Sequence, residues 1–309
     1  MRHLLSITDL RPDEMKLLIK NAIAMKKNPK KFSKALAQKT LLMIFEKPSL
    51  RTRVSFETGM TQLGGHAIYY DVSTSPMGKG ETVGDTTACA SRYADLIMGR
   101  IRHDALVEMT KTSRVPIINA LSELEHPCQI LSDYMTIFEK KKTFKTTISF
   151  VGDGNNNITH SLILGAALLG ANIRVGCPAE KDVMPNPEIL AHAKTIAKKS
   201  GSVIEIVSDP ITAVKDADVV YADTWVSYYT PPEEKEKRIA LFKPYQITTE
   251  LLSHAKKDVS FMHNLPALRG MEVTANVIDG KHSIVFDQAE NRLHAQKALM
   301  VWLLKQKNV

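Results

Sequence analysis

Residues 147–170 have the sequence TISFVGDGNNNITHSLILGAALLG, and they decide the fold class. The apolar, β-branched run Thr147–Val151 predicts a buried strand, and a glycine-rich turn follows it. Ile158, Leu162 and Leu169 then lie on one face of a helix. A strand that passes through a short turn into a helix is the repeating unit of a parallel sheet covered by helices.

The same unit recurs before and after this segment. Apolar runs alternate with longer stretches of helical period, and they fall into two sets separated by the charged stretch Glu139–Lys142. This alternation predicts an α/β protein with two doubly wound parallel-sheet domains. The expected strands span 41–45, 67–70, 96–98 and 115–118 in the first set, and 147–151, 173–175, 203–207, 219–222, 259–262 and 284–286 in the second. The clearest helical patterns lie at 49–64, 129–138 and 287–304.

Chain length supports the division, since 309 residues exceed what one hydrophobic core usually serves. We expect a first domain at 1–142 and a second at 143–286. The C-terminal helix at 287–309 is expected to complete the first domain.

The composition is that of an ordinary folded protein, with 44% apolar and 24% charged residues. The formal net charge of +8 is spread along the chain, and the densest basic run, Lys140–Lys142, is short. We therefore expect a solvated surface and no nucleic acid partner. A positive balance also suits an anionic small substrate.

Three widely spaced cysteines, Cys89, Cys128 and Cys177, form no CxxC pair. A disulfide framework and a zinc site are therefore not expected, and a reducing compartment fits best. No apolar stretch reaches the roughly 18 residues of a membrane span, and the N-terminal apolar run is too short for a signal sequence. These features predict a soluble, cytoplasmic protein with no membrane partner.

A phosphate-binding corner is indicated by Glu46–Arg53, EKPSLRTR, where an expected strand gives way to a helix. Unpaired backbone N–H groups and the positive end of the helix dipole point at one spot there. Ser49 and Thr52 add hydroxyls, and Arg51 and Arg53 can each offer a bidentate fork to a phosphate. A serine N-cap followed by surface arginines explains the same spacing equally well.

His126–Gln129, HPCQ, lies between an expected strand and an expected helix. This is the usual place for site residues in an open parallel sheet. The imidazole and the amide could donate hydrogen bonds to a carbonyl oxygen, although a lone histidine in a turn is more often structural.

Gly152–Asn157, GDGNNN, suggests a dinucleotide-binding turn, so a nicotinamide-dependent dehydrogenase is one alternative. The third glycine of that fingerprint is absent at Asn157, and GCP at 176–178 stands where an acidic residue is expected. The carboxamides are better suited to the carboxylate or amine of a ligand.

Three later segments place polar residues at strand ends or in the last helix. Asp223 ends a strand and could hold an ammonium group, although a helix N-cap explains it too. His263–Pro266, HNLP, ends the next strand. Arg292 lies inside the last helix, where a buried arginine needs an anionic partner and a surface one forms a salt bridge.

Together these segments resemble the ornithine carbamoyltransferases over essentially the whole chain. The resemblance is carried, in order, by Ser49–Arg53, Met98–Arg100, His126–Gln129, Asp153–Asn156, Asp223–Ser227, His263–Pro266 and Glu290–Arg292. It implies two α/β domains with the active site between them, a homotrimer or a multiple of trimers, and no cofactor or metal. It also implies carbamoyl transfer from carbamoyl phosphate to L-ornithine, which yields L-citrulline and phosphate in arginine biosynthesis.

The resemblance further implies a role for each matched residue. The carbamoyl phosphate contacts would be Ser49, Leu50, Arg51, Thr52, Arg100, His126, Gln129, Asn264, the backbone carbonyl of Leu265, and Arg292. The ornithine contacts would be Asn156, Asp223, Ser227 and Tyr228. The catalytic residues would be Arg100, His126, Asp223 and Asn264.

Four positions depart from the family pattern. Leu50 replaces a threonine of the phosphate loop, and Pro76 stands near where a glutamine or histidine reaches the neighbouring subunit's phosphate. Tyr228–Tyr229 stands where methionine and glycine are usual, and Asn264 replaces the cysteine of the His-Cys-Leu-Pro motif. Because the last two changes flank the amine pocket, putrescine or a modified ornithine is an alternative acceptor. A degenerate paralogue that binds carbamoyl phosphate without catalysis is the non-enzymatic alternative.

Overall fold

The structure of the protein is a computed structural model that describes residues 1–226 and 230–305. The chain divides into two compact units. Unit 1 contains Met1–Met135 and the segment that starts at Glu290, and unit 2 contains Thr136–Ala289. The limits between the units fall inside two helices, α5 (Pro127–Lys141) and α12 (Val285–Lys305). The domain boundaries expected at 142/143 and 286/287 stay a prediction.

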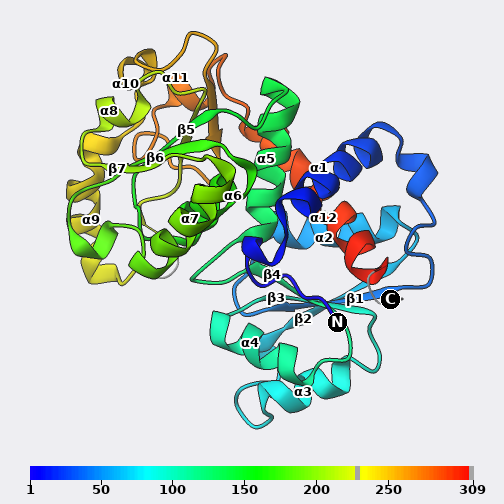
Figure 1. Ribbon diagram of the computed structural model, residues 1–309. Helices are drawn as coiled ribbons and strands as arrows, with labels where there is room; N and C mark the ends of the chain where they lie inside the picture. The colour runs from blue at the N-terminus through cyan, green and yellow to red at the C-terminus, as the bar shows by residue number, and fades with distance from the viewer. Residues whose placement is uncertain (227–229, 306–309) are drawn as a thin grey trace. The chain divides into compact units, whose positions relative to one another are not determined.

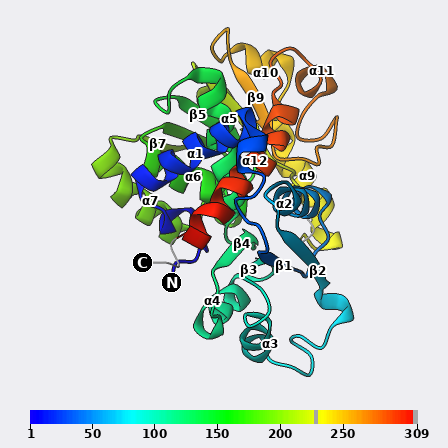
Figure 2. The same cartoon turned by 90° about the vertical axis from the view of Figure 1, so that its right-hand side faces the viewer.

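Unit 1 is built on a four-stranded sheet in the order β2-β1-β3-β4, and every strand pair in it is parallel. Figure 1 shows α3 and α4 on one side of this sheet and α2 on the other, and Figure 2 shows the strand order from another direction. The strands are β1 (Thr40–Phe45), β2 (His66–Asp71), β3 (Leu96–Arg100) and β4 (Ile117–Leu121). The helices are α1 (Pro12–Lys27), α2 (Leu50–Gln62), α3 (Val83–Ala90) and α4 (His103–Thr112).

The core of unit 1 explains why these elements form. Ile44, Ile97 and Ile117 point from three neighbouring strands toward Leu106 and Met109 of α4. Their burial removes large branched side chains from water, which is the main stabilising contribution in such a sheet.

Unit 2 has a five-stranded sheet in the order β7-β6-β5-β8-β9, again with parallel pairs throughout. The strands are β5 (Thr147–Val151), β6 (Asn172–Gly176), β7 (Ile204–Val207), β8 (Val219–Ala222) and β9 (Ser260–His263). The helices are α6 (Asn157–Leu169), α7 (Pro187–Ser200), α8 (Pro210–Val214), α9 (Lys235–Phe242), α10 (Thr249–Ser253) and α11 (Ala275–Ile278).

Helix α6 is buried along its whole length from Ile158 to Leu169, not only on one face. A helix that is apolar all round has to be covered on all sides, and α7 packs along it. The other face of the sheet packs against α8, α10 and α11 through Val214, Leu252 and Val277.

Short 3₁₀ helices connect several of these elements. They are η1 (Ile7–Asp9), η2 (Pro29–Phe32), η3 (Val72–Thr74), η4 (Lys181–Val183), η5 (Pro232–Glu234) and η6 (Lys243–Tyr245). Among the described residues, no helix combines the length and the apolar character needed to cross a bilayer.

The expected α/β class with two doubly wound parallel sheets is confirmed, but one expected strand is wrong. Residues 284–286 were expected to be extended, whereas α12 begins at Val285. Ile284 N donates to Phe261 O at 3.0 Å, and its own carbonyl accepts from Gln288 N at 2.9 Å, the spacing of a helix. Ile284 therefore hydrogen-bonds to β9 at the edge of the sheet, and the chain enters α12 at the next residue.

Both sheets reverse their strand order at one point, between β1 and β3 in unit 1 and between β5 and β8 in unit 2. In open α/β sheets, ligands bind outside the carboxyl ends of the strands at such a switch point. In each unit, motif residues that follow the strands on either side of this switch point can therefore lie close together.

Candidate active site

The corner after β1 ends in the N-terminus of α2, and Ser49 is the N-cap of that helix. Its Oγ accepts a hydrogen bond from the backbone N of Thr52 at 3.3 Å. Thr52 is buried, whereas the side chain of Leu50 is 75% exposed. The first-turn amides of a 13-residue helix, together with two hydroxyls, form a surface that favours an anion.

Two further motif residues follow the next strands of the same sheet. Arg100 is the last residue of β3, and His126 comes directly before α5, and both are buried. Burial lowers the pKa of His126 well below its ordinary value, and the charges of Arg292, Arg100 and Arg51 lower it further. The imidazole is therefore neutral near pH 7, with three guanidinium groups acting on it.

Arg292 connects three helices of unit 1. Its Nη1 donates to Gln129 Oε1 at 2.5 Å, and its Nη2 donates a longer bond to Thr52 Oγ1 at 3.4 Å. Gln129 Nε2 in turn donates to Asp133 Oδ1 at 2.8 Å. Gln129 and Arg292 thus lie beside the corner at Thr52, as members of one buried hydrogen-bond network.

The electrostatic balance of this cluster is positive. Arg51, Arg100 and Arg292 act on the His126 ring, while Asp133 supplies the carboxylate of the network. Buried positive charge is stabilised when an anion with several acceptor oxygens binds to it. Chemically, the cluster can bind a phosphate and polarise a carbonyl oxygen next to it.

In unit 2, the loop after β5 is held in a fixed conformation. Asp153 Oδ1 accepts from Asn155 N at 2.9 Å, and Arg238 forms an ion pair with Asp153 Oδ2. Arg238 Nε also donates to Trp225 O at 2.9 Å. Burial raises the pKa of Asp153 above its ordinary value, and the nearby charge of Arg238 offsets only part of this rise.

Asn156 is the N-cap of α6. Its Oδ1 accepts from Thr159 N at 2.8 Å, and its Nδ2 donates to Asp153 O at 2.9 Å. A carboxamide nitrogen has two N–H donors, and only one of them is used among the residues that the structure describes, while the oxygen accepts from the helix.

Asp223 and Asn264 follow the neighbouring strands β8 and β9. Burial raises the pKa of Asp223, and this effect is partly offset by His263, by the backbone N–H of Thr224 and by a hydrogen bond from the Asn264 side chain. The pairing of Ala222 with His263 places the two residues next to each other at the carboxyl edge of the second sheet.

The turn after β9 is shaped by a buried histidine. Leu265 N donates to His263 Nδ1 at 2.9 Å, so the ring proton of the neutral histidine is on Nε2. That nitrogen lies 3.2 Å from Glu272 Oε1, in an arrangement that is not aligned as a hydrogen bond. Leu265 has a φ of 59° and is joined to Pro266 by a cis peptide bond.

Two of the expected ornithine contacts, Ser227 and Tyr228, lie outside the described residues, as does Tyr229. Among the residues that are described, no group of three or more His, Cys, Asp or Glu side chains could hold a metal ion.

Two family models match the chain. Residues 2–139 match the carbamoyl-P binding domain of aspartate/ornithine carbamoyltransferases, and residues 145–303 match their Asp/Orn binding domain. The chain belongs to the aspartate/ornithine carbamoyltransferase family.

Individual carbamoyltransferases are similar over nearly the full length. The ornithine carbamoyltransferase of Archaeoglobus fulgidus is 49% identical over 308 residues, covering 98% of each chain. That of Methanothermobacter thermautotrophicus is 49% identical over 305 residues, covering 98% of this chain and 99% of the relative. The solved ornithine carbamoyltransferase of Pyrococcus furiosus is 45% identical with a TM-score of 0.94, covering 98% of this chain and 97% of that one.

This carbamoyltransferase family membership confirms the resemblance drawn from the motifs, and it makes the chain a carbamoyltransferase rather than a dehydrogenase. Apart from Gln129 and Arg292, which lie within α5 and α12, the described motif residues follow the carboxyl ends of the strands, where a parallel sheet binds its ligands. Their individual roles stay proposals.

Sequence reasoning missed several side chains of this carbamoyltransferase. Asp133 lies four residues after Gln129 on α5, a spacing that could have suggested their hydrogen bond. Arg238 beside Asp153 gave no local signal, because the two residues are 85 positions apart along the chain. Glu272 lies nine positions after His263, beyond the turn that follows β9, and that spacing matches no helix or strand period.

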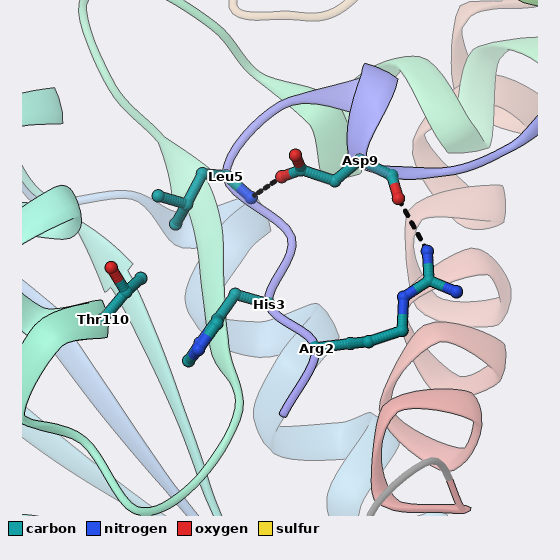
Figure 3. A pocket seen from close by; sticks show the side chains of 5 residues that line it. All are labelled: Arg2, His3, Leu5, Asp9 and Thr110. Atoms are coloured by element: carbon teal, nitrogen blue, oxygen red, sulfur yellow. Dashed lines mark hydrogen bonds between the residues drawn. The ribbon is translucent and has the colours of Figure 1, made fainter.

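A separate pocket lies in unit 1 of the carbamoyltransferase, away from the motifs, between the N-terminal segment and α4 (Figure 3). Its lining residues are Arg2, His3, Leu5, Asp9 and Thr110. Leu5 N donates to Asp9 Oδ2 and Arg2 Nη2 donates to Asp9 O, each at 2.7 Å. These groups hold the N-terminal segment in place, and none of them belongs to a motif of the family.

Proposed function

We propose that this chain is an ornithine carbamoyltransferase, which converts carbamoyl phosphate and L-ornithine to L-citrulline and phosphate. The observation that carries the proposal is the position of buried Arg292, which donates to Gln129 Oε1 at 2.5 Å and to Thr52 Oγ1 at 3.4 Å beside the N-terminus of α2. Such a cluster fits a doubly charged phosphate joined to a carbonyl. The names of the relatives with 49% identity support the same reaction.

Carbamoyl phosphate binds to unit 1 in this proposal. The phosphate is held by Ser49, Arg51 and Thr52, by the backbone of Leu50 and by Arg292. Gln129 positions Arg292 through the bond at 2.5 Å and contacts the carbamoyl end. The side chain of Leu50 offers no hydroxyl, so its contribution comes from the N–H at the start of α2.

The carbonyl oxygen is polarised by Arg100, His126 and Thr52. Negative charge builds on this oxygen when the amine attacks, and donors fixed in advance stabilise it without reorganisation. A neutral His126 can donate one N–H to the oxygen while adding no positive charge to the three guanidinium groups.

Unit 2 supplies the acceptor contacts, with Asn156, Asp223, Ser227 and Tyr228 binding ornithine. The lone pair of the neutral amine forms the new bond to the carbamoyl carbon. The bond from that carbon to the phosphate oxygen breaks, and its electron pair leaves with phosphate. One amine proton ends on the phosphate, so the charges balance. Asp223 and Asn264 orient the amine, and the backbone carbonyl of Leu265 contacts the carbamoyl amide.

We also propose a homotrimer or a multiple of trimers in the cytoplasm, with a role in arginine biosynthesis. The family resemblance supports the assembly. The names of relatives from Pyrococcus furiosus and Campylobacter jejuni, which carry the word anabolic, support the pathway. Sedimentation equilibrium of the purified chain tests the assembly, and a stable monomer would contradict it.

The decisive experiment is citrulline formation from carbamoyl phosphate and ornithine by the purified protein. Putrescine and modified ornithines are run beside it, because Asn264 and Tyr228 depart from the family pattern. Turnover of another amine in place of ornithine would refute the acceptor assignment. A shift in melting temperature with carbamoyl phosphate but no turnover of any amine would favour the non-catalytic paralogue.

A further inference from the structure

Helix α12 packs against α2 in unit 1, and two glutamine side chains bridge the two helices (Figure 1). Gln62, the last residue of α2, accepts a hydrogen bond from Lys297 Nζ at 2.9 Å. Gln296, four residues after Arg292 on α12, is fully buried and reaches Ser55 nearer the start of α2. Only this second bridge lies next to the phosphate corner.

The neighbours of the Gln296 carboxamide determine its orientation. One end lies 3.1 Å from Arg292 Nη2, and the other lies 2.9 Å from Arg292 O and 2.5 Å from Ser55 Oγ. A guanidinium nitrogen only donates and a backbone carbonyl only accepts. The carboxamide oxygen therefore faces the guanidinium and its nitrogen faces the carbonyl, and all three contacts are then hydrogen bonds.

The contact with Ser55 extends this network to the first turn of α2. Ser55 Oγ accepts from the Gln296 nitrogen, and it donates its single proton to Arg51 O at 2.6 Å. A buried network of this kind holds its members in one arrangement, because a broken bond would leave a polar group without water. Gln296 thus joins the guanidinium of Arg292 to the turn of α2 whose N–H groups form the phosphate corner.

Two uncharged glutamines hold the guanidinium of Arg292. Nη1 donates to Gln129 Oε1 at 2.5 Å, and Nη2 donates to Gln296 as well as to Thr52 Oγ1, the latter at 3.4 Å. An amide oxygen accepts from a guanidinium without cancelling its charge, whereas a carboxylate in its place would form an ion pair. The positive charge is therefore fixed in position and kept for an anion.

We propose that Gln296 is a positioning residue for carbamoyl phosphate binding, which acts by fixing the guanidinium of Arg292 beside the first turn of α2. This inference rests on the proposed function. Gln296 contacts Arg292 and not the substrate in this proposal. Its loss should therefore weaken carbamoyl phosphate binding only as long as Arg292 is present, and it should leave the acceptor contacts of unit 2 unchanged.

The first test measures the affinity for carbamoyl phosphate by isothermal titration calorimetry, with the purified full-length protein and the variant Gln296→Met. Methionine keeps nearly the length and volume of glutamine but forms none of the three bonds. We expect the affinity to fall about 3- to 10-fold, as the loss of one hydrogen bond does. Gln62→Met is the matched control, because it removes the other bridge between α2 and α12 and should leave the affinity unchanged.

A double-mutant cycle shows whether Gln296 acts through Arg292. In the Arg292→Ala background the guanidinium is absent, so Gln296→Met should lower the affinity no further. A general loosening of the helix pair would lower the affinity in both backgrounds. Equal losses in the two backgrounds would therefore overturn the positioning role.

Steady-state kinetics give a second readout. Gln296→Met should raise KM for carbamoyl phosphate by about the same 3- to 10-fold factor, with kcat and KM for the amine nearly unchanged, as expected when binding to ground state and transition state is lost equally. A fall in kcat with an unchanged KM for carbamoyl phosphate would contradict a role in binding.

Ser55→Ala carries the test if melting curves show that Gln296→Met does not fold. Alanine is favourable inside a helix, and the variant removes the link from Gln296 to Arg51 O. We expect a loss of affinity of about 2- to 5-fold. Thr61→Ala is its control, since Thr61 Oγ1 makes the equivalent bond to Glu57 O at 3.1 Å on the exposed side of α2.

The outcomes separate the two proposals. A wild type that forms citrulline, with an affinity unchanged in Gln296→Met or lowered equally in Gln62→Met, overturns the role of Gln296 and leaves the proposed function standing. A wild type that binds carbamoyl phosphate but forms no citrulline refutes the proposed reaction, and the calorimetric comparison still decides the role of Gln296. A wild type that does not bind carbamoyl phosphate refutes both.

Discussion

Arg292 Nη1 donates a hydrogen bond to Gln129 Oε1 at 2.5 Å, which joins α12 to α5 across 163 residues of sequence. Gln129 directs its nitrogen to the carboxylate of Asp133. Because a neutral amide stands between Asp133 and Arg292, the guanidinium is held in place without being neutralised. The network therefore fixes the position of Arg292 and keeps its charge for an anion.

Replacing Arg292 with alanine should weaken carbamoyl phosphate binding about 10- to 150-fold, the effect of losing a hydrogen bond to a charged group. Isothermal titration calorimetry measures it directly. Arg269→Ala is the control, since Arg269 is half-exposed and pairs with Asp279 at 2.6 Å on the surface of unit 2. Equal affinities of the two variants for carbamoyl phosphate would show that Arg292 does not bind the phosphate.

Gln129→Glu should lower the affinity for carbamoyl phosphate while keeping the fold. The new carboxylate faces Arg292 and cancels the charge that attracts the phosphate, at nearly unchanged side-chain volume. We expect a loss of about 10-fold or more, with a lower melting temperature because the new carboxylate faces Asp133 Oδ1, which loses its amide donor. Tighter binding in this variant would contradict a positive site.

His126 should make the free energy of unfolding depend on pH. Its pKa in the folded protein is lowered by burial and by Arg292, Arg100 and Arg51, so below about pH 6.5 the unfolded chain binds a proton that the folded chain does not. Stability contributed by the neutral ring is present above pH 6.5 and is lost as pH falls, at about 1.4 kcal/mol per pH unit.

The measurement compares urea unfolding of the wild type and His126→Asn at pH 7.5, 6.5 and 5.5. The wild type should lose about 1 kcal/mol more than the variant between the last two values, because the unfolded histidine is already half protonated at pH 6.5. An equal loss of unfolding free energy in both proteins would contradict a lowered pKa of His126 in the folded state.

Leu50→Thr should tighten carbamoyl phosphate binding. Leu50 is 75% exposed at the first position of α2, so the smaller polar side chain costs little packing. A new hydroxyl beside the phosphate should contribute about 0.5 to 1.5 kcal/mol, which is a roughly 2- to 10-fold gain in affinity. Leu50→Val, which adds no donor, is the matched control and should leave the affinity unchanged.

Local sequence determined most of the secondary structure. The periodicities of residues 147–170 predicted β5 and α6, and the start and end of β5 agree with the expected range. β-Branched runs and helical spacing act over a few residues, so they can be recognised without the fold. The strand predicted at 284–286 is wrong, because the conformation there depends on a neighbouring strand. Ile284 hydrogen-bonds to Phe261 of β9, and the chain then enters α12.

The sequence by itself also determined which residue types stand at the strand ends, since the carboxyl ends of parallel strands meet at one edge of a sheet. Only the tertiary structure decided how they contact each other. The bond of Arg292 to Gln129 and the ion pair of Arg238 with Asp153 join residues 163 and 85 positions apart. No local pattern encodes such pairs, because packing of separate helices and strands brings them together.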